Sequence, residues 1–329
     1  MSLNNTHLSY IQSVNNLSIR NIGLTGKNPS VACLIVDYSG SPKGKVLSFG
    51  CTSKDGSTHA EVDALKKISN NKITNKTVMY VSLEPCFKEG DCCAKKIVKK
   101  GIKKVFISSL DPNPLIFKKG VHYLKKNNVS IFNVKITNNK FKEINKYFYT
   151  FQKKKRPYIT LKLAISKNGY TKDFNNPNIT SPDTQYYMHK YRLSHDAIAV
   201  GYNTFKEDKP KLNCRLNGIN KRNYRFIISR HNKIKKFNLI KLDFKRNIND
   251  IFQKLERYEI KSILIEGGLN TFNYFFKNSH FDEIIICQSK NSVKISKPRY
   301  KFDQILLNKN LKLYSSFPYG DDFINIYRK

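Results

Sequence analysis

Short apolar runs and segments of helical periodicity alternate along the first half of the chain, and this alternation restricts the fold more than any other feature. The strand-like runs are VACLIVDY (31–38), TVMYVSL (77–83), KKVFISSL (103–110) and VSIFNV (129–134). The helical segments lie at 59–68, 93–101 and about 118–127. Each such helix carries the chain back across a face of a sheet, so the next strand runs parallel to the last. We therefore predict a mostly parallel sheet with helices on its faces.

The alternation is interrupted near residue 152 and then resumes. A helix is expected to run to about 152, the charged cluster KKKR (153–156) is typical of a linker, and Pro157 opens a new strand. The second half contains strands near 158–166, 196–201, 224–229, 262–268, 282–287, 311–317 and 323–328, and helices near 184–193, 249–257 and from 270. A chain of 329 residues is long for one domain and sufficient for two of about 150. We predict an α/β protein of two domains, 1–152 and 153–329.

The formal net charge of +36 raises the question of polyanion binding. The lysines are spread through both halves of the chain, which is typical of a Lys- and Asn-rich composition, so a nucleic-acid partner is not favoured. No apolar run approaches the roughly 20 residues of a membrane span. Residues 1–20 also lack the continuous apolar stretch of a signal peptide. We expect a soluble, cytoplasmic protein with no membrane partner. Its oligomeric state is open, and a homo-oligomer is one of the states we consider.

Seven cysteines, an odd number, are scattered along the chain. Without an export signal they indicate reduced thiols and not a disulfide framework. Cys86 and Cys93 combine with His59, which opens a helix, and with Glu61 two positions later. One imidazole and two thiolates would give Zn²⁺ three protein ligands and leave a fourth position for water, as a catalytic zinc site requires. Such a metal lowers the pKa of the bound water, and Glu61 would carry its proton to the leaving amine.

The third ligand has two candidates, because Cys92 and Cys93 are adjacent. Cys93 falls in the first turn of the helix that Gly101 closes. There the helix dipole and the free N–H groups stabilise a thiolate. We favour Cys93. Taken singly, His59 is more often a helix cap, Glu61 a first-turn acid and Cys86 a small core residue; their combination and spacing favour the metal site.

An ordered series of motifs extends through both halves of the chain. They are NPSVACLIV, THAEVDAL, SLEPC and DPNP in the first half, and RPYITLKLAIS, ITSPD, HKYRLSHDAIAVGYNTFKEDKPKLNCR and ILIEGG in the second. In this order they resemble the RibD family of bifunctional riboflavin biosynthesis proteins. The resemblance implies a cytidine-deaminase-like three-layer α/β/α domain followed by a dihydrofolate-reductase-like α/β domain. It covers almost the whole chain.

For the first domain the resemblance implies zinc-dependent hydrolytic deamination of 2,5-diamino-6-(5-phosphoribosylamino)pyrimidin-4(3H)-one, a small phosphorylated pyrimidine. His59, Cys86 and Cys93 match the zinc ligands, and Glu61 matches the catalytic proton shuttle. The residues that match the rim of the substrate pocket are Asn28, Asp111 and Asn113.

For the second domain the resemblance implies reduction of the ribosyl group of 5-amino-6-(5-phosphoribosylamino)uracil with NADPH. The residues that match cofactor contacts are Ala164, Thr204, Asp208, Gly268, Leu269 and Asn270, and a helix beginning after Gly268 would face a phosphate group. The residues that match substrate contacts are Arg192, Leu212, Arg215 and Glu266. Lys162 lies on an otherwise apolar strand, and we expect it to face the ribosyl group.

The chain departs from the family pattern in both domains. The loop between Cys86 and Cys93 is short, with six intervening residues, and Lys88 stands where a histidine is expected. Asn178 stands where a tryptophan is expected, and the chain contains no tryptophan. The first departure changes one side of the deaminase pocket, and the second changes the packing around the cofactor.

Two alternatives remain at this point. The first is a nucleic-acid deaminase of the tRNA-editing type, which shares the HAE and Pro-Cys motifs and would suit the charge of +36. That class has P-C-x-x-C, whereas here the second thiol is farther away, and the second half of the chain would be unexplained. The other alternative is a reductase whose deaminase half has decayed into a scaffold, which the short loop suggests. Decay should erode His59, Glu61 and Cys86, and all three are present.

Overall fold

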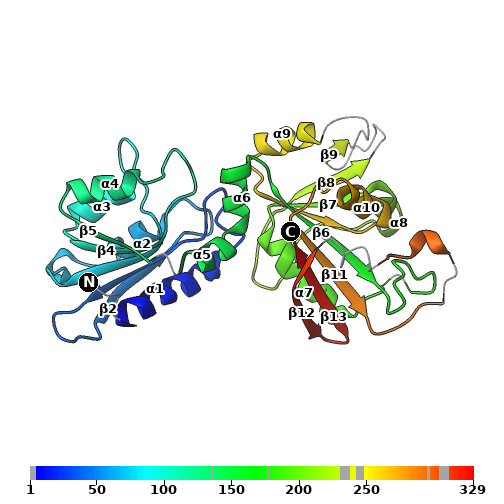
Figure 1. The fold of residues 1–329 in the computed structure, drawn as a ribbon, viewed down its shortest axis with the longest axis horizontal. Coiled ribbons are helices and arrows are strands. Elements are labelled where there is room, and N and C mark those ends of the chain that lie inside the picture. Colours follow the sequence, from blue (N-terminus) through cyan, green and yellow to red (C-terminus); the bar gives the residue numbers. More distant parts are fainter. Residues whose placement is uncertain are drawn as a thin grey trace. The chain divides into compact units, whose positions relative to one another are not determined.

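The computed structural model describes residues 5–134, 137–176, 178–229, 238–241, 248–294, 297–303 and 311–329. The chain divides into two compact units, Met1–Lys155 and Arg156–Lys329, each built around its own sheet (Figure 1). The predicted division after residue 152 lies three residues earlier. Lys153 and Lys154 belong to the last turn of a helix and not to a linker.

The first unit contains a five-stranded sheet of order β2-β1-β3-β4-β5. Its strands are β1 (Ala32–Asp37), β2 (Lys45–Cys51), β3 (Thr77–Leu83), β4 (Lys104–Ser109) and β5 (Ser130–Asn133). Its helices are α1 (Asn5–Leu17), α2 (Ala60–Lys66), α3 (Cys93–Lys99), α4 (Lys119–Lys126), α5 (Asn138–Ile144) and α6 (Lys146–Lys154), with short 3-10 helices at Ser18–Asn21 and Asn70–Lys72.

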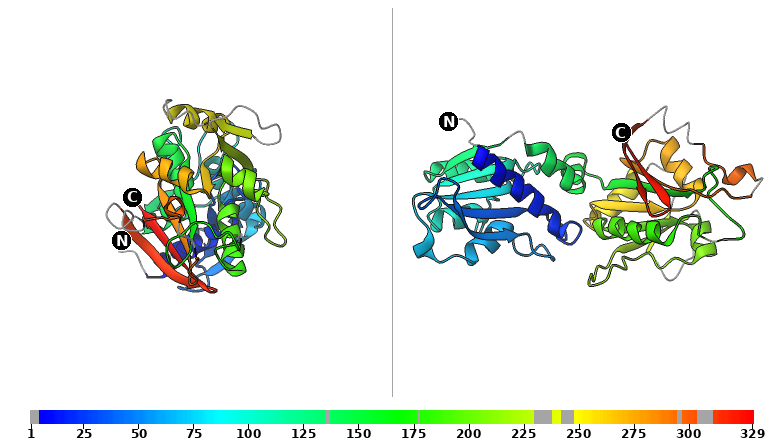
Figure 2. Two further views of the ribbon diagram at one scale, coloured as in Figure 1. Left: turned by 90° about the vertical axis from the view of Figure 1, so that its right-hand side faces the viewer. Right: turned by 90° about the horizontal axis from the view of Figure 1, so that it is seen from below.

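Alternate residues of the first sheet pack on opposite faces. Leu34 and Tyr80 pack with α1, whereas Ile35 and Met79 pack with α2, α3 and α4. This period of two is what a strand buried on both faces produces. The unit therefore has three layers, α/β/α, with α1 crossing one face of the strands (Figure 2). The predicted architecture of the first domain is confirmed.

The first sheet is mixed, and the prediction of a mostly parallel sheet is wrong for this unit. β3, β4 and β5 are parallel, but β1 pairs antiparallel with both β2 and β3. Neither β2 nor α1 was predicted. β2 is an edge strand with much of its side-chain surface exposed, and α1 buries only Ile11, Val14 and Asn15. A segment that is mostly exposed carries little hydrophobic periodicity.

The second unit contains an eight-stranded sheet of order β12-β13-β11-β6-β10-β7-β8-β9. Its strands are β6 (Tyr158–Ile165), β7 (Ala197–Gly201), β8 (Tyr224–Ser229), β9 (Asn238–Lys241), β10 (Ser262–Glu266), β11 (Glu283–Ser289), β12 (Lys312–Tyr319) and β13 (Asp322–Arg328). Its helices are α7 (Pro182–Ser194), α8 (Tyr202–Asp208), α9 (Asn249–Arg257) and α10 (Leu269–Lys277), with a short 3-10 helix at Pro298–Tyr300. Of these elements, β9 and α8 were not predicted.

The central strands of the second sheet are parallel, from β11 through β9, and only the β12–β13 hairpin is antiparallel. α9 and α10 cover one face, and α7 and α8 cover the other. The carboxyl ends of β6, β7, β8 and β10 consequently meet at one edge of the sheet, where open α/β sheets bind ligands. Among the described residues, no helix is both long enough and apolar enough to cross a membrane.

Candidate functional site

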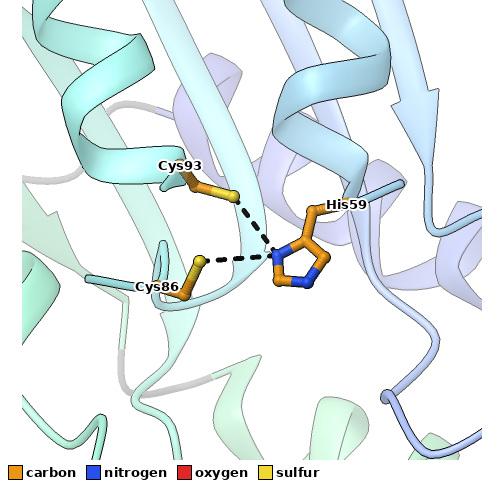
Figure 3. A group of neighbouring side chains, drawn as sticks. All are labelled: His59, Cys86 and Cys93. Atoms are coloured by element: carbon orange, nitrogen blue, oxygen red, sulfur yellow. Dashed lines mark hydrogen bonds between the residues drawn. The ribbon is translucent and has the colours of Figure 1, made fainter. Parts of the chain in front are cut away.

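Three segments of the first unit bring His59, Cys86 and Cys93 together (Figure 3). His59 is the N-cap of α2, Cys86 lies in the segment that follows β3, and Cys93 is the first residue of α3. Both sulfur atoms point at the same imidazole nitrogen: Nδ1 of His59 lies 3.5 Å from Sγ of Cys86 and 3.3 Å from Sγ of Cys93. The three ligand atoms lie within 4.8 Å of one another.

These separations fit a zinc ion. Tetrahedral zinc with Zn–S of about 2.3 Å and Zn–N of about 2.0 Å requires a sulfur-to-nitrogen distance of about 3.5 Å. The donor set of one imidazole and two thiols also matches the softness of zinc, and with three ligands it leaves the fourth position open. The three side chains thus form a site of the catalytic type.

Cys92, the other candidate for the third ligand, is the N-cap of α3 and is buried in the hydrophobic core of the unit. It is not in the group of side chains whose donor atoms converge. The geometry supports the choice of Cys93.

Separate replacement of the two thiols tests this choice. We expect Cys93→Ala to reduce zinc affinity by at least about 100-fold, because even the residues that support ligands contribute 10–100-fold. We expect Cys92→Ala to retain close to one zinc per chain, because its loss removes core packing and not a ligand. Metal analysis after dialysis against a weak chelator distinguishes the two variants. Loss of zinc from the Cys92 variant alone would reverse the assignment.

Glu61 lies in the first turn of α2 and is buried, with 3% of its surface exposed. Burial, the largest cause, and the negative charge of Cys86 together raise the pKa of its carboxyl to about 7, and His59 opposes the shift. Cys93 interacts with the carboxyl and lowers its pKa. A carboxyl group with a pKa near neutrality can both accept and release a proton under physiological conditions. Glu61 is therefore suited to proton transfer beside the metal ligands.

The edge strand β2 fixes the position of α2. Gly50 touches the first turn of the helix so closely that a Cβ there would lie 2.1 Å from the carbonyl oxygen of Ala60. The main-chain N–H of Cys51 also donates to the carboxylate of Asp63 at 3.2 Å. The unpredicted strand is thus part of the support for His59 and Glu61.

The three predicted rim residues lie in loops of the first unit. Asn28 Nδ2 donates to the carbonyl oxygen of Gly56 at 2.8 Å. Asp111 is buried, burial raises the pKa of its carboxyl to about 6, and it interacts electrostatically with Cys86 and His59. Its Oδ1 accepts from the main-chain N–H of Asn113 at 2.8 Å, which forms a tight turn. Asp111 is therefore close to the metal ligands, and Asn113 is positioned by it.

The second unit contains a cavity of ≈ 1120 Å³ at the carboxyl edge of its sheet. Nine of the residues predicted from the sequence line it: Lys162, Ala164, Arg192, Thr204, Asp208, Glu266, Gly268, Leu269 and Asn270. Leu212 and Arg215 are not among the lining residues. Leu212 is fully buried against Val200 and Phe205, and Arg215 is exposed and hydrogen-bonded to Asn213.

Lys162 and Ala164 are the only residues of β6 that are not fully buried. They are two positions apart, so their side chains point to the same face of the strand. That face meets the cavity, which both residues line. The lysine that seemed out of place in an apolar strand thus lines the cavity, and its contact with a ribosyl group stays a prediction.

Arg192 and Glu266 form a bidentate ion pair in the wall of the cavity. Nε and Nη2 of Arg192 donate to the two carboxylate oxygens of Glu266 at 2.8 and 2.6 Å, and Nη1 donates to the carbonyl oxygen of Asn213 at 3.3 Å. The side chains are only 16% and 11% exposed. Three of the five guanidinium N–H groups are thus occupied, which leaves two for an anion.

A turn of two glycines follows β10 and packs against Thr204 of α8. Gly267 and Gly268 have φ of 80° and 69°, and a Cβ on Gly268 would lie 2.8 Å from Oγ1 of Thr204. α10 begins directly after this turn. Because glycines have no side chain, the main-chain N–H groups at the start of α10 are accessible from the cavity. Open α/β sheets bind phosphate groups at such helix N-termini. The helix N-terminus beside this turn is chemically suited to a phosphate group such as those of NADPH.

Sequence reasoning missed several lining residues, including Ser229, Thr271, Lys172 and Tyr300. Ser229 ends β8 and shares the carboxyl edge with Gly201 and Glu266, so a count of strand ends would have identified it. Lys172 forms an ion pair with Glu207 at 2.6 Å across the cavity wall. Loop residues such as Lys172 and Tyr300 carry no periodic signal.

His189 on α7 makes the stability of the second unit depend on pH. Its Nδ1 accepts from the main-chain N–H of Arg215 at 3.0 Å, so this nitrogen must be unprotonated. Burial lowers its pKa from 6.5 to about 4, assisted by Arg192 and Arg215 and opposed by Glu266. The unfolded chain then binds a proton that the folded chain excludes, so stability is complete above pH 6.5 and falls as the pH drops towards 4.

Thermal unfolding of the second unit between pH 4 and 7 measures this effect. We expect His189→Gln, whose amide oxygen accepts but does not titrate, to flatten the curve in that window. An unchanged slope in the variant would assign the acid sensitivity to other groups.

Both units of the chain match known protein families. The family model described as the RibD C-terminal domain matches residues 157–324, and that of the cytidine and deoxycytidylate deaminase zinc-binding region matches residues 5–109. The chain is 30% identical to the riboflavin biosynthesis protein RibD of Aquifex aeolicus over 311 residues, 84% of this chain and 85% of that protein. It is also 38% identical over 127 residues to the diaminohydroxyphosphoribosylamino-pyrimidine deaminase of Buchnera aphidicola from Schizaphis graminum, 38% of this chain and 81% of that protein.

Two solved structures share the fold along nearly the whole chain. The structure of RibD from Acinetobacter baumannii has a TM-score of 0.85 at 24% identity and covers 97% of this chain and 98% of that one. The structure of a diaminohydroxyphosphoribosylaminopyrimidine deaminase/5-amino-6-(5-phosphoribosylamino)uracil reductase from Thermotoga maritima has a TM-score of 0.84 at 22% identity and covers 99% of both chains. The predicted combination of a deaminase-like and a reductase-like fold is confirmed.

Proposed function

The chain belongs to the RibD family of riboflavin biosynthesis proteins and is a bifunctional deaminase and reductase, and from this premise we propose that its two units act in succession on one phosphorylated pyrimidine. The first unit would deaminate 2,5-diamino-6-(5-phosphoribosylamino)pyrimidin-4(3H)-one. The second would reduce the ribosyl group of the product, 5-amino-6-(5-phosphoribosylamino)uracil, with NADPH. The convergence of His59, Cys86 and Cys93 beside a buried Glu61 supports the first step most directly.

In the deaminase site the protein residues hold the metal and move a proton. His59, Cys86 and Cys93 would hold zinc, which when bound supplies a polarised water as the nucleophile. Glu61 would take a proton from that nucleophile and give it to the leaving nitrogen, a double role that a pKa of about 7 permits. Asn28, Asp111 and Asn113 would line the pocket and orient the ring. The buried position of Glu61 keeps bulk water away from the proton path.

In the reductase site the cavity would hold both the cofactor and the substrate. NADPH, when bound, supplies the reducing equivalents. Its contacts would come from Ala164, Thr204, Asp208 and the segment Gly268–Asn270, whose helix N-terminus suits a phosphate group. Lys162 would bind the sugar through its ammonium group, and the free N–H groups of Arg192 would face an anionic part of the substrate. Leu212 and Arg215 complete the proposed substrate set, Leu212 by packing behind the wall and Arg215 at the exposed margin.

A small-molecule substrate fits both sites. We propose that the protein works in the cytoplasm, which the seven unpaired cysteines support, because thiols stay reduced there.

Two readouts separate the two activities. We expect incubation of the purified chain with the diaminopyrimidine ribotide to release ammonia without NADPH, and to oxidise NADPH only after deamination has begun. A single-stranded RNA containing adenosine and cytidine should release no ammonia. Oxidation of NADPH without ammonia release would refute the deaminase half of the proposal, and ammonia release from RNA alone would refute the substrate.

A further inference from the structure

Glu84 lies two residues before Cys86 and has no role in the chemistry above. Its side chain is buried, with 2% of the residue exposed. Its main-chain N–H donates to the carbonyl oxygen of Ser109 at 2.9 Å, which ties the end of β3 to the end of β4. The main chain at Glu84 is therefore fixed, and the direction of its carboxylate is set by the sheet.

The carboxylate accepts hydrogen bonds from the main chain of one segment, residues 111–121. Oε2 accepts from the N–H groups of Asp111 at 3.3 Å and Lys118 at 3.0 Å, and Oε1 accepts from that of Val121 at 3.3 Å. Lys118 is the N-cap of α4, so the carboxylate also neutralises the positive end of the helix dipole.

Two further features show how closely this segment is held. Lys118 has φ of 60°, a conformation that residues with side chains rarely adopt, and its N–H is one of the three donors to Glu84. Gly120 packs on the residue after Glu84: a Cβ there would lie 1.8 Å from the carbonyl oxygen of Pro85. Residues 118–121 therefore lie directly against the chain that leads to Cys86, and the contact leaves no room for a side chain.

We propose that Glu84 is a positioning residue for the deaminase pocket, whose carboxylate fixes the Asp111–Asn113 turn relative to Cys86. This proposal rests on the deaminase function proposed above. The turn begins at Asp111, whose N–H is bonded to Glu84 and whose carboxylate holds Asn113. Three N–H donors converge on the two side-chain oxygens of Glu84, and a carboxylate matches them because it has two acceptor oxygens and no hydrogen. Glu84 thus connects the metal-ligand segment to the segment that faces the substrate.

Glu84→Gln replaces one of the two acceptor oxygens with a donor. We expect the KM for the pyrimidine substrate to rise by roughly tenfold or more, because bonds to a buried charged acceptor are lost from the pocket wall. Zinc content and NADPH-dependent reduction should equal those of the wild type. Hydrogen exchange of the segment 111–121 should accelerate, a readout that does not depend on activity. Glu143→Gln on α5 is the matched control and should change none of these.

Gly120→Ala disturbs the same contact from the other side and leaves Glu84 intact. We expect the same pattern: a higher KM, retained zinc, normal reduction and faster exchange of residues 111–121. Gly40→Ala is its control, because a Cβ there meets no atom within 4 Å. If Glu84→Gln does not fold, the glycine pair tests the proposal.

Three outcomes would overturn the proposal. Loss of zinc from either variant would place Glu84 in support of the metal centre and not of the turn. A lower kcat with unchanged KM would give it a part in the reaction itself. Unchanged KM and exchange in both variants would remove any positioning role. Wild-type protein that releases no ammonia would refute the deaminase function itself, and the exchange measurement would then still decide whether Glu84 holds the segment.

Discussion

Glu61→Gln is expected to reduce deamination by about 10²- to 10⁴-fold, the range that a positioned proton-transfer group contributes. The amide matches the carboxyl in size but carries no titratable proton. Glu61 is buried beside Cys93, and none of the three converging donor atoms belongs to it. The zinc content and the reductase activity should therefore stay as in the wild type. Ammonia release, metal analysis and NADPH oxidation measure the three properties on one preparation.

The control for this experiment is Glu143→Gln, which makes the same chemical change on α5 of the same unit. It should retain full deamination. A Glu61 variant that still deaminates at the wild-type rate would mean that another group moves the proton. A variant that loses zinc would mean that Glu61 supports the metal site, in which case its loss of activity would carry no information on proton transfer.

Arg192→Ala is expected to destabilise the second unit by about 3–5 kcal/mol, the usual cost of leaving a buried charge without its partner. Glu266 is the charge that would be left, 11% exposed and with its pKa lowered mainly by Arg192 against the opposing effect of burial. The first unit has its own core and should unfold as before. Calorimetry that resolves the two transitions measures the difference.

A double variant separates the effect of the unpaired Glu266 charge from the effect of the lost packing of the Arg192 side chain. Arg192→Ala combined with Glu266→Gln removes both charges, and we expect it to recover most of the lost stability. Arg222→Ala, an exposed arginine of the same unit, should cost less than about 1 kcal/mol. If Arg192→Ala lowers the free energy of unfolding no more than Arg222→Ala does, the Arg192–Glu266 ion pair contributes little to stability, which would contradict the prediction.

The chemistry of the metal site was predictable because it depends on residue type and local position. His59 and Cys93 each stand at the start of a helix, and the sequence indicates helix starts through the first apolar residues and the closing glycine. The choice between Cys92 and Cys93 also followed from helix position. What the sequence did not indicate was β2, whose contact with α2 holds Glu61 in place. An edge strand buries too little for its pattern to be visible.

The second site was predictable as a set of residues but not as an arrangement. Arg192 and Glu266 were both expected to contact substrate, and their pairing with each other arises from a long-range contact between α7 and β10. Leu212 and Arg215 lie beside the cavity and not on its wall, because the loop that carries them has no periodicity that fixes side-chain direction. Contacts between residues far apart in the sequence depend on the tertiary fold, so the sequence pattern alone does not predict them.

The central claim is that His59, Cys86 and Cys93 bind one zinc ion with a fourth position open. X-ray absorption at the zinc edge of the purified chain tests it most directly. We expect two sulfur neighbours at about 2.3 Å and two nitrogen or oxygen neighbours at about 2.0 Å. Three sulfur neighbours would bring Cys92 into the site, and a protein purified without zinc that takes up none on addition would contradict the claim altogether.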